Sequence, residues 1–132
     1  MKAFYQKTIE DLEADAAGGE ARALVRLADA LRSGLRGATV DPARALQLEL
    51  QAAELQLEKL RKYDARYREL VAGRAATEAN YDDVHFQFES AKVKVDQIRQ
   101  QIRDAQVISP VSGTVVAKNV EVGEYVGANT AV

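Results

Sequence analysis

The chain has 132 residues, which is about the length of one domain and excludes a second large domain. Hydrophobic residues make up 47% and charged residues 29%, with only 8 Gly and 2 Pro, so the composition favours a folded and largely helical chain. The formal net charge of −2 lacks the basic excess of nucleic-acid-binding proteins, and the absence of Cys excludes disulfides and thiolate metal sites.

Residues 1–40 show helical patterning that glycines interrupt. Gly18 and Gly19 form one break and the stretch from Gly34 to Gly37 forms another, because glycine readily adopts the positive φ angles that end helices. This pattern predicts two short helices, near residues 2–16 and 20–33. The second helix has an apolar face that must pack on another element, made of Ala21, Leu24, Leu27, Ala28 and Leu31.

A long helix is predicted to begin at Asp41 and Pro42, since Asp caps free amides and Pro is tolerated in the first turn. Apolar residues then alternate in steps of three and four, which is the pattern of a heptad seam. One polar residue interrupts this first seam, which consists of Leu46, Leu50, Ala53, Leu57, Leu60, Asp64, Tyr67 and Val71. A second, uninterrupted seam follows the break at Gly73 and consists of Tyr81, Val84, Phe88, Ala91, Val95, Ile98, Ile102 and Ala105.

The two seams are mirror images about residue 74, which predicts that the chain folds back at this point. The expected unit is an antiparallel coiled-coil hairpin over residues 41–106, with its tip near 72–77. Each arm has about 28 residues and would be roughly 40 Å long, so the tip would lie far from the base.

Polar residues in and beside the seams have several interpretations. Asp64 either fixes the register of the hairpin or turns outward while Tyr63 takes its place, and the second alternative is slightly favoured. His85 is expected to make a polar contact beside the seam, near Asp64. Asp82 and Asp83 point about 100° apart on a helix, so they favour a helix start rather than a catalytic pair.

Past Ala105 the pattern changes to β-branched residues separated by Pro110, Gly113, Gly123 and Gly127. Residues 107–132 are therefore expected to form short strands joined by tight turns. A few short strands cannot bury two faces by themselves, so this segment needs complementary strands and is expected to be part of a domain.

A helical hairpin that leads into Ile108-Ser109-Pro110-Val111-Ser112-Gly113 and then Val122-Gly123-Glu124-Tyr125-Val126 resembles the HlyD-like membrane fusion proteins. These are the periplasmic adaptor subunits of bacterial efflux and secretion systems. The resemblance covers roughly residues 45–132 and implies that residues 107–132 are the returning half of a lipoyl-like domain. The expected fold class is mainly α, with short N-terminal helices, the coiled-coil hairpin and this small partial β segment.

A second resemblance lies at the predicted tip. Family members that dock outer-membrane channels of the TolC type carry an Arg, a Leu four residues later and a Ser seven residues after that. Arg66, Leu70 and Thr77 have this spacing, with Thr in place of Ser. The resemblance implies that Arg66 offers charged hydrogen bonds to the channel, Leu70 an apolar contact and Thr77 a hydroxyl that also caps the second arm.

The N-terminal part departs from the family pattern. The sequence is expected to lack the first half of the lipoyl-like domain, the β-barrel and the membrane-proximal domain, and it has no secretion signal or stretch of about 20 apolar residues. Residues 15–53 instead resemble one Sel-like, tetratricopeptide-related repeat, while some adaptors carry an additional helical pair before the main hairpin. A fragment, an unusual short adaptor and a fused product all remain open.

Residues suited to catalysis are few. His85 has no partner pattern, Gly18-Gly19 is not a phosphate-binding loop, and Val111-Ser112-Gly113 is not a nucleophile elbow. Lipoyl and biotinyl carriers modify a Lys in a tight turn, but Lys118 lacks the flanking Met of those sites. We therefore expect no enzyme, no metal and no cofactor.

The resemblance implies a non-enzymatic adaptor in transmembrane transport. Its expected partners are an outer-membrane channel of the TolC type, an inner-membrane transporter and further copies of itself, with no nucleic acid. Its expected location is the periplasm, associated with the inner membrane. The alternatives are a soluble helical-repeat module for protein–protein interaction and a carrier-type lipoyl or biotinyl domain.

Overall fold

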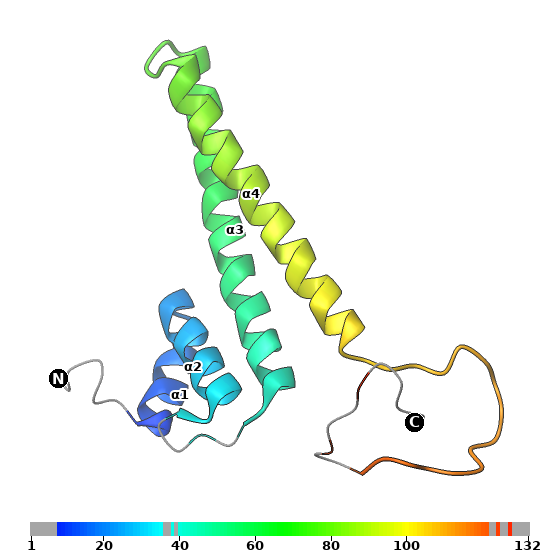
Figure 1. Ribbon diagram of the computed structural model, residues 1–132. Helices are drawn as coiled ribbons and strands as arrows, with labels where there is room; N and C mark the ends of the chain where they lie inside the picture. Colours follow the sequence, from blue (N-terminus) through cyan, green and yellow to red (C-terminus); the bar gives the residue numbers. More distant parts are fainter. Residues whose placement is uncertain (1–7, 36–37, 39, 122–123, 125–126, 128–132) are drawn as a thin grey trace.

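The computed structural model describes residues 8–35, 38, 40–121, 124 and 127. Within this part of the chain there are four α-helices and no strand: α1 (Ile9–Ala17), α2 (Ala21–Ser33), α3 (Pro42–Ala72) and α4 (Glu78–Asp104). Figure 1 shows α3 and α4 as a long antiparallel hairpin, with α1 and α2 beside the lower end of α3. The predicted mainly helical fold is confirmed for the described residues.

The two short helices are delimited by caps and glycines. Thr8 and Asp11 form a capping box, in which the Thr8 hydroxyl accepts from the Asp11 amide and the Asp11 carboxylate accepts from the Thr8 amide. α2 ends at Gly34, whose φ of 68° lies in the left-handed region that favours glycine. The predicted breaks at Gly18–Gly19 and at Gly34 are therefore confirmed, while Gly37 and residues 2–7 of the first predicted helix lie outside the described residues.

The main hydrophobic core joins α1, α2 and the first turns of α3. All five residues of the predicted apolar face of α2 contribute to it, four of them buried and Ala21 partly buried. Small residues of α3 let α2 approach closely, and Ala45 is completely buried. The buried members of this core are Leu12, Ala16, Ala23, Leu24, Leu27, Ala28, Ala30, Leu31, Ala45 and Ala52.

The α3–α4 hairpin buries a narrower seam. Leu60, Asp64, Val95 and Ile98 are buried, and nearly all the other predicted seam residues are half-buried. Two helices in contact can shield only one face of each, which is why most seam residues keep partial exposure. An ion pair of 2.8 Å between Arg99 Nη2 and Glu54 Oε1 also crosses from α4 to α3.

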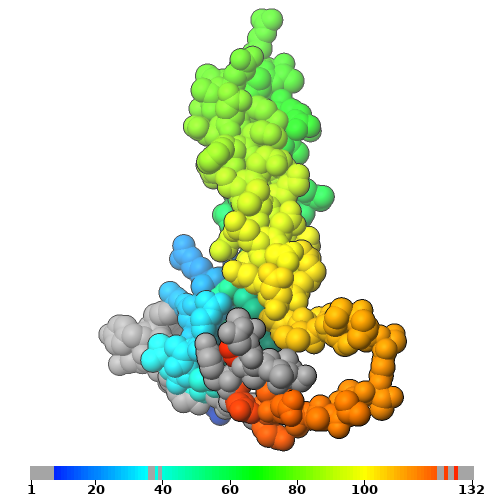
Figure 2. All heavy atoms as spheres, turned by 45° about the vertical axis from the view of Figure 1, so that its right-hand side comes forward, coloured from blue at the N-terminus to red at the C-terminus, as the bar shows by residue number. Residues whose placement is uncertain are grey.

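The long helix α3 begins where the sequence predicts a start. Asp41 is its N-cap, with Oδ1 accepting from the Arg44 amide at 2.9 Å, and Pro42 occupies the first turn. The 31 residues of α3 correspond to a rod of about 46 Å. Because α1 and α2 cover only its lower end, the upper part of the hairpin projects beyond them (Figures 1 and 2).

The segment after α4 forms no strand within residues 105–121. Five of its apolar residues are 73–98% exposed, namely Val107, Ile108, Val111, Val115 and Val116. Figure 2 shows this segment, in orange, as a loop that extends away from the helices. Strands need hydrogen-bonding partners along their edges, and the described residues supply none, so the predicted β segment stays a prediction.

None of the described helices combines the length and the apolar character that a membrane-spanning helix requires.

Candidate functional site at the hairpin tip

The tip turn is built from the backbone at the end of α3. The amide of Ala75 donates to the carbonyl of Leu70 at 2.8 Å, and the amide of Arg74 donates to the carbonyl of Val71 at 2.9 Å. These two bonds form a Schellman motif, which satisfies carbonyls that the helix end leaves without partners. Arg74 occupies the left-handed position of this motif with φ 57°, and Gly73 precedes it with φ −81°.

The second arm starts directly after this turn. Thr77 is the N-cap of α4, and its hydroxyl oxygen accepts a hydrogen bond from the Asn80 amide at 3.3 Å. Glu78 adds a negative charge to the first turn, where it interacts favourably with the helix dipole. The predicted capping role of Thr77 is thus present in the structure.

Arg66, Leu70 and Thr77 all lie at this end of the hairpin. Arg66 and Leu70 are four residues apart on α3, so they share one helix face. Leu70 is half-buried, whereas Arg66 and Thr77 are exposed. This arrangement leaves a charged group, part of an apolar side chain and a hydroxyl accessible near the turn.

The electrostatics of the tip depend on which cations are already paired. Arg61 and Lys62 contact Glu58 at 3.2 and 3.6 Å, and Lys59 lies over the Tyr63 ring at 5.7 Å. Arg68 is held by two groups described below. Among the described residues, Arg66 and Arg74 have no hydrogen bond or ion pair through their side chains, so they are the tip cations free to meet a partner.

A polar cluster crosses the hairpin just below the tip. Asp64 Oδ1 lies 2.8 Å from His85 Nδ1, and Arg68 Nη2 donates to Asp64 Oδ2 at 3.4 Å and to the Tyr81 hydroxyl at 3.2 Å. The Tyr81 and His85 rings stack with centroids 5.4 Å apart. The hydrogen bond that Arg68 donates to the Tyr81 hydroxyl, together with the nearby oxygens of Tyr81 and Asp64, raises the pKa of Arg68 above its ordinary value, so this side chain stays cationic.

This cluster decides between the two interpretations of Asp64. Asp64 is only 6% exposed while Tyr63 is 41% exposed, so the favoured alternative, in which Asp64 turns outward and Tyr63 replaces it, is wrong. The carboxylate stays in the seam because His85 and Arg68 satisfy its oxygens. The expected contact between His85 and Asp64 is confirmed. The contributions of Arg68 and Tyr81 were missed, although the spacing of four residues between Asp64 and Arg68 is a usable signal.

The other candidate sites, for a metal, a covalent cofactor or a catalytic pair, have few suitable side chains among the described residues. Within the described ranges, no group of three or more His, Asp or Glu side chains could hold a metal ion. Lys118 is exposed and its Nζ lies 3.1 Å from a Glu121 carboxylate oxygen. Asp82 and Asp83 lie exposed in the second turn of α4.

Comparison with curated proteins finds 96 residues, 73% of this chain, that are 29% identical to the multidrug resistance protein MexA of Pseudomonas aeruginosa. The matched stretch is 25% of MexA, so this chain spans about a quarter of the length of that relative. No model of a protein family matches the chain, and no solved structure matches it. The similarity to MexA, a membrane fusion protein, supports a relationship of this chain to that class.

Proposed function

We propose that this chain is the helical hairpin segment of a periplasmic adaptor in a tripartite efflux or secretion system. Its tip docks an outer-membrane channel of the TolC type, and its base faces an inner-membrane transporter. The function is structural and non-enzymatic, because the hairpin bridges two partners. The similarity to MexA supports the membrane fusion class, while the HlyD-like subtype, the channel type and the docking residues are parts of the proposal.

The observation that carries the proposal is the group of accessible side chains at the tip of the hairpin. Arg66 has no partner within the described part of the chain, Leu70 keeps part of its surface exposed, and Thr77 lies at the turn itself. Arg66 provides a planar group that can donate several hydrogen bonds to carbonyls or carboxylates of a channel. Each such contact at an exposed tip is weak, so several hairpins that bind one channel together would provide the avidity.

The test is Arg66→Asp in a binding assay with a purified TolC-type channel. Arg66 lies outside the seam, so helicity measured by circular dichroism is expected to be unchanged while channel binding weakens about tenfold or more. The matched control is Arg22→Asp, which makes the same charge change at the base, on an exposed arginine of α2. Unchanged binding by Arg66→Asp, or an equal loss in both variants, would refute the tip assignment.

A second candidate function is a helical-repeat interaction module. It is favoured by the core of α1, α2 and the lower part of α3, which contains most of the buried apolar residues described above. This is the region that resembles a Sel-like repeat. Under this alternative, Arg66→Asp would leave partner binding intact, whereas substitutions on the exposed face of α2 would abolish it.

The carrier-domain alternative depends on Lys118. Intact-mass measurement of the protein purified from its own host is the direct test, since a lipoyl or biotinyl group on this lysine adds a defined mass. An unmodified chain would count against this alternative.

A further inference from the structure

The two arms of the hairpin carry apolar side chains on the faces that point away from each other. Phe86 and Val93 of α4 are 73% and 54% exposed, the highest values among the large apolar side chains of the described helices, and Leu55 of α3 is 41% exposed. Each lies midway between two seam residues that are four apart, so it occupies the side of its helix opposite to the seam. We call these sides the outer faces of α3 and α4.

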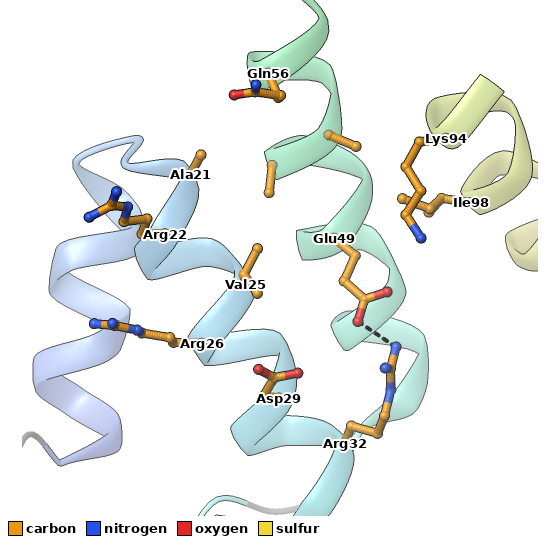
Figure 3. A pocket seen from close by; sticks show the side chains of 12 residues that line it. Ala21, Arg22, Val25, Arg26, Asp29, Arg32, Glu49, Gln56, Lys94 and Ile98 are labelled. Carbon is orange, nitrogen blue, oxygen red and sulfur yellow. Dashed lines mark hydrogen bonds and ion pairs between the residues drawn. The ribbon is translucent and has the colours of Figure 1, made fainter. Parts of the chain in front are cut away.

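The lower part of the outer face of α3 is already in use. Leu48 lies one heptad below Leu55 on the same side and packs against the core formed with α1 and α2. In Figure 3 the upper end of α2, marked by Ala21, lies below Gln56, and α3 continues above it. The outer face of α3 is therefore covered by the chain's own helices up to Leu48 and open from Leu55 upward.

The open stretches of the two outer faces carry opposite charge. From Leu55 to Arg66, α3 exposes four cations and one carboxylate, namely Lys59, Arg61, Lys62, Arg66 and Glu58. From Asp82 to Val93, α4 has three carboxylates and one lysine at least partly exposed, namely Asp82, Asp83, Glu89 and Lys92. The charge of one arm thus complements that of the other.

The apolar residues of the two outer faces also lie at the same height. Asp64 faces His85 across the hairpin at 2.8 Å, which fixes the register of the arms. Nine residues below Asp64 on α3 lies Leu55. At the same height on α4, nine residues after His85, lies Lys94, and Val93 precedes it.

We propose that the outer face of α4 binds the outer face of α3 of a second copy of this chain, with both tips pointing the same way. Val93 then meets Leu55 of the second copy, because the two are level. By the same count Phe86 meets Lys62, which its contact with Glu58 leaves 74% exposed. The stem of this lysine packs on the Phe86 ring and its ammonium group lies over the ring face.

Other arrangements of two copies fit less well. Pairing two α4 faces would bring carboxylates together, and pairing two α3 faces would bring cations together. In a copy with its tip inverted, alignment of Leu55 with Val93 would place Leu48 opposite Phe86, where the core of the second copy already covers that face. The proposed contact joins two different surfaces, so each end of the pair keeps one free face to which a further copy can add.

The test uses the full chain, which contains no Cys. Leu55→Cys and Val93→Cys are prepared separately, mixed at about 0.5 mM and mildly oxidised, because a contact of this size is expected to be weak and a disulfide traps it. Mass spectrometry separates the mixed dimer from the two dimers of like variants. The mixed dimer is expected to form at least about fivefold faster than either of these. No dimer, or like dimers that form as fast as the mixed one, would overturn the proposal.

The direction of the contact provides a matched control. Asp82→Lys with Asp83→Lys in the Val93→Cys chain is expected to slow the mixed dimer about tenfold, because these side chains then face the cations of α3. The same two substitutions in the Leu55→Cys chain should leave the rate unchanged, since its α4 face lies outside the contact. Equal slowing in both chains would refute the assignment.

Phe86→Ala supplies an uncharged variant. In the Val93→Cys chain it is expected to slow the mixed dimer at least about threefold, and in the Leu55→Cys chain it should have no effect. Circular dichroism verifies that each variant keeps its helicity, as expected for exposed sites. The contact does not rest on docking at the tip, and the assay contains no channel, so a failure here leaves the channel-binding test of Arg66→Asp unaffected.

Discussion

Replacing Arg74 by glycine is expected to stabilise the hairpin turn. Arg74 adopts a φ of 57°, which costs a residue with a side chain about 1–2 kcal/mol relative to glycine. A new glycine also makes the unfolded chain more flexible, which offsets about 0.4–1 kcal/mol of this gain. The net expectation for Arg74→Gly is an increase of about 1 kcal/mol in the free energy of unfolding.

The neighbouring glycine gives the complementary variant. Gly73 has a φ of −81°, which any residue adopts, and an added Cβ would lie 3.5 Å from the Glu69 carbonyl oxygen and 3.8 Å from that of Leu70. These are ordinary contact distances, so Gly73→Ala is expected to gain about 0.4–1 kcal/mol by restricting the unfolded chain. The sequence alone suggests the opposite, because Gly73 is the glycine at the break between the two seams.

Urea unfolding followed by circular dichroism provides the assay, with hydrogen exchange of the Ala75 amide as a local probe of the turn. The control is Arg74→Ala, which removes the guanidinium but keeps the left-handed backbone, and its stability is expected to stay close to that of the parent. A destabilisation of more than about 1 kcal/mol by Gly73→Ala, or any loss of stability by Arg74→Gly, would refute the reasoning.

Three further predictions concern the seam, the cap and the register. Val95 is 1% exposed, and Val95→Ala is expected to lower the free energy of unfolding in urea by about 2 kcal/mol. Val93 is 54% exposed, and Val93→Ala should lower it by less than about 0.5 kcal/mol. Equal effects of the two variants would contradict the packing of Val95 in the seam. Thr77→Ala is expected to lower stability by about 1 kcal/mol through loss of the cap of α4 and Thr77→Ser to leave it nearly unchanged, so a similar loss in both would argue against capping. Glu54→Arg is expected to lower stability by about 0.5 kcal/mol at low salt, and the double variant Glu54→Arg with Arg99→Glu is expected to restore it. A double variant that does not recover stability would show that these two side chains do not interact.

Periodicity predicted the hairpin because its signal depends only on residue type and spacing. Val95 and Ile98 lie in the uninterrupted second seam and are both buried, as heptad packing requires. Asp64 could not be assigned in this way, because its burial depends on partners from both arms of the hairpin. The positive φ of Arg74 was equally hidden, since the pattern marks where a helix breaks and does not specify which residue takes the left-handed position.

The predicted strands show the limit of local propensity. β-branched residues favour a strand only when a neighbouring strand accepts their backbone hydrogen bonds, and Val115 and Val116 have no such neighbour among the described residues.

The two faces of α3 explain why the main hydrophobic core and the proposed docking residues lie at opposite ends of the molecule. One face, with Ala45 and Ala52, packs against α2 and belongs to the main core, while another face, with Leu60 and Asp64, packs against α4. A pair of helices by itself buries little apolar surface, so the additional core at the base contributes stability by packing against the lower end of α3. The tip can therefore expose Arg66 and tolerate a strained turn, because most of the burial that stabilises the fold lies below it.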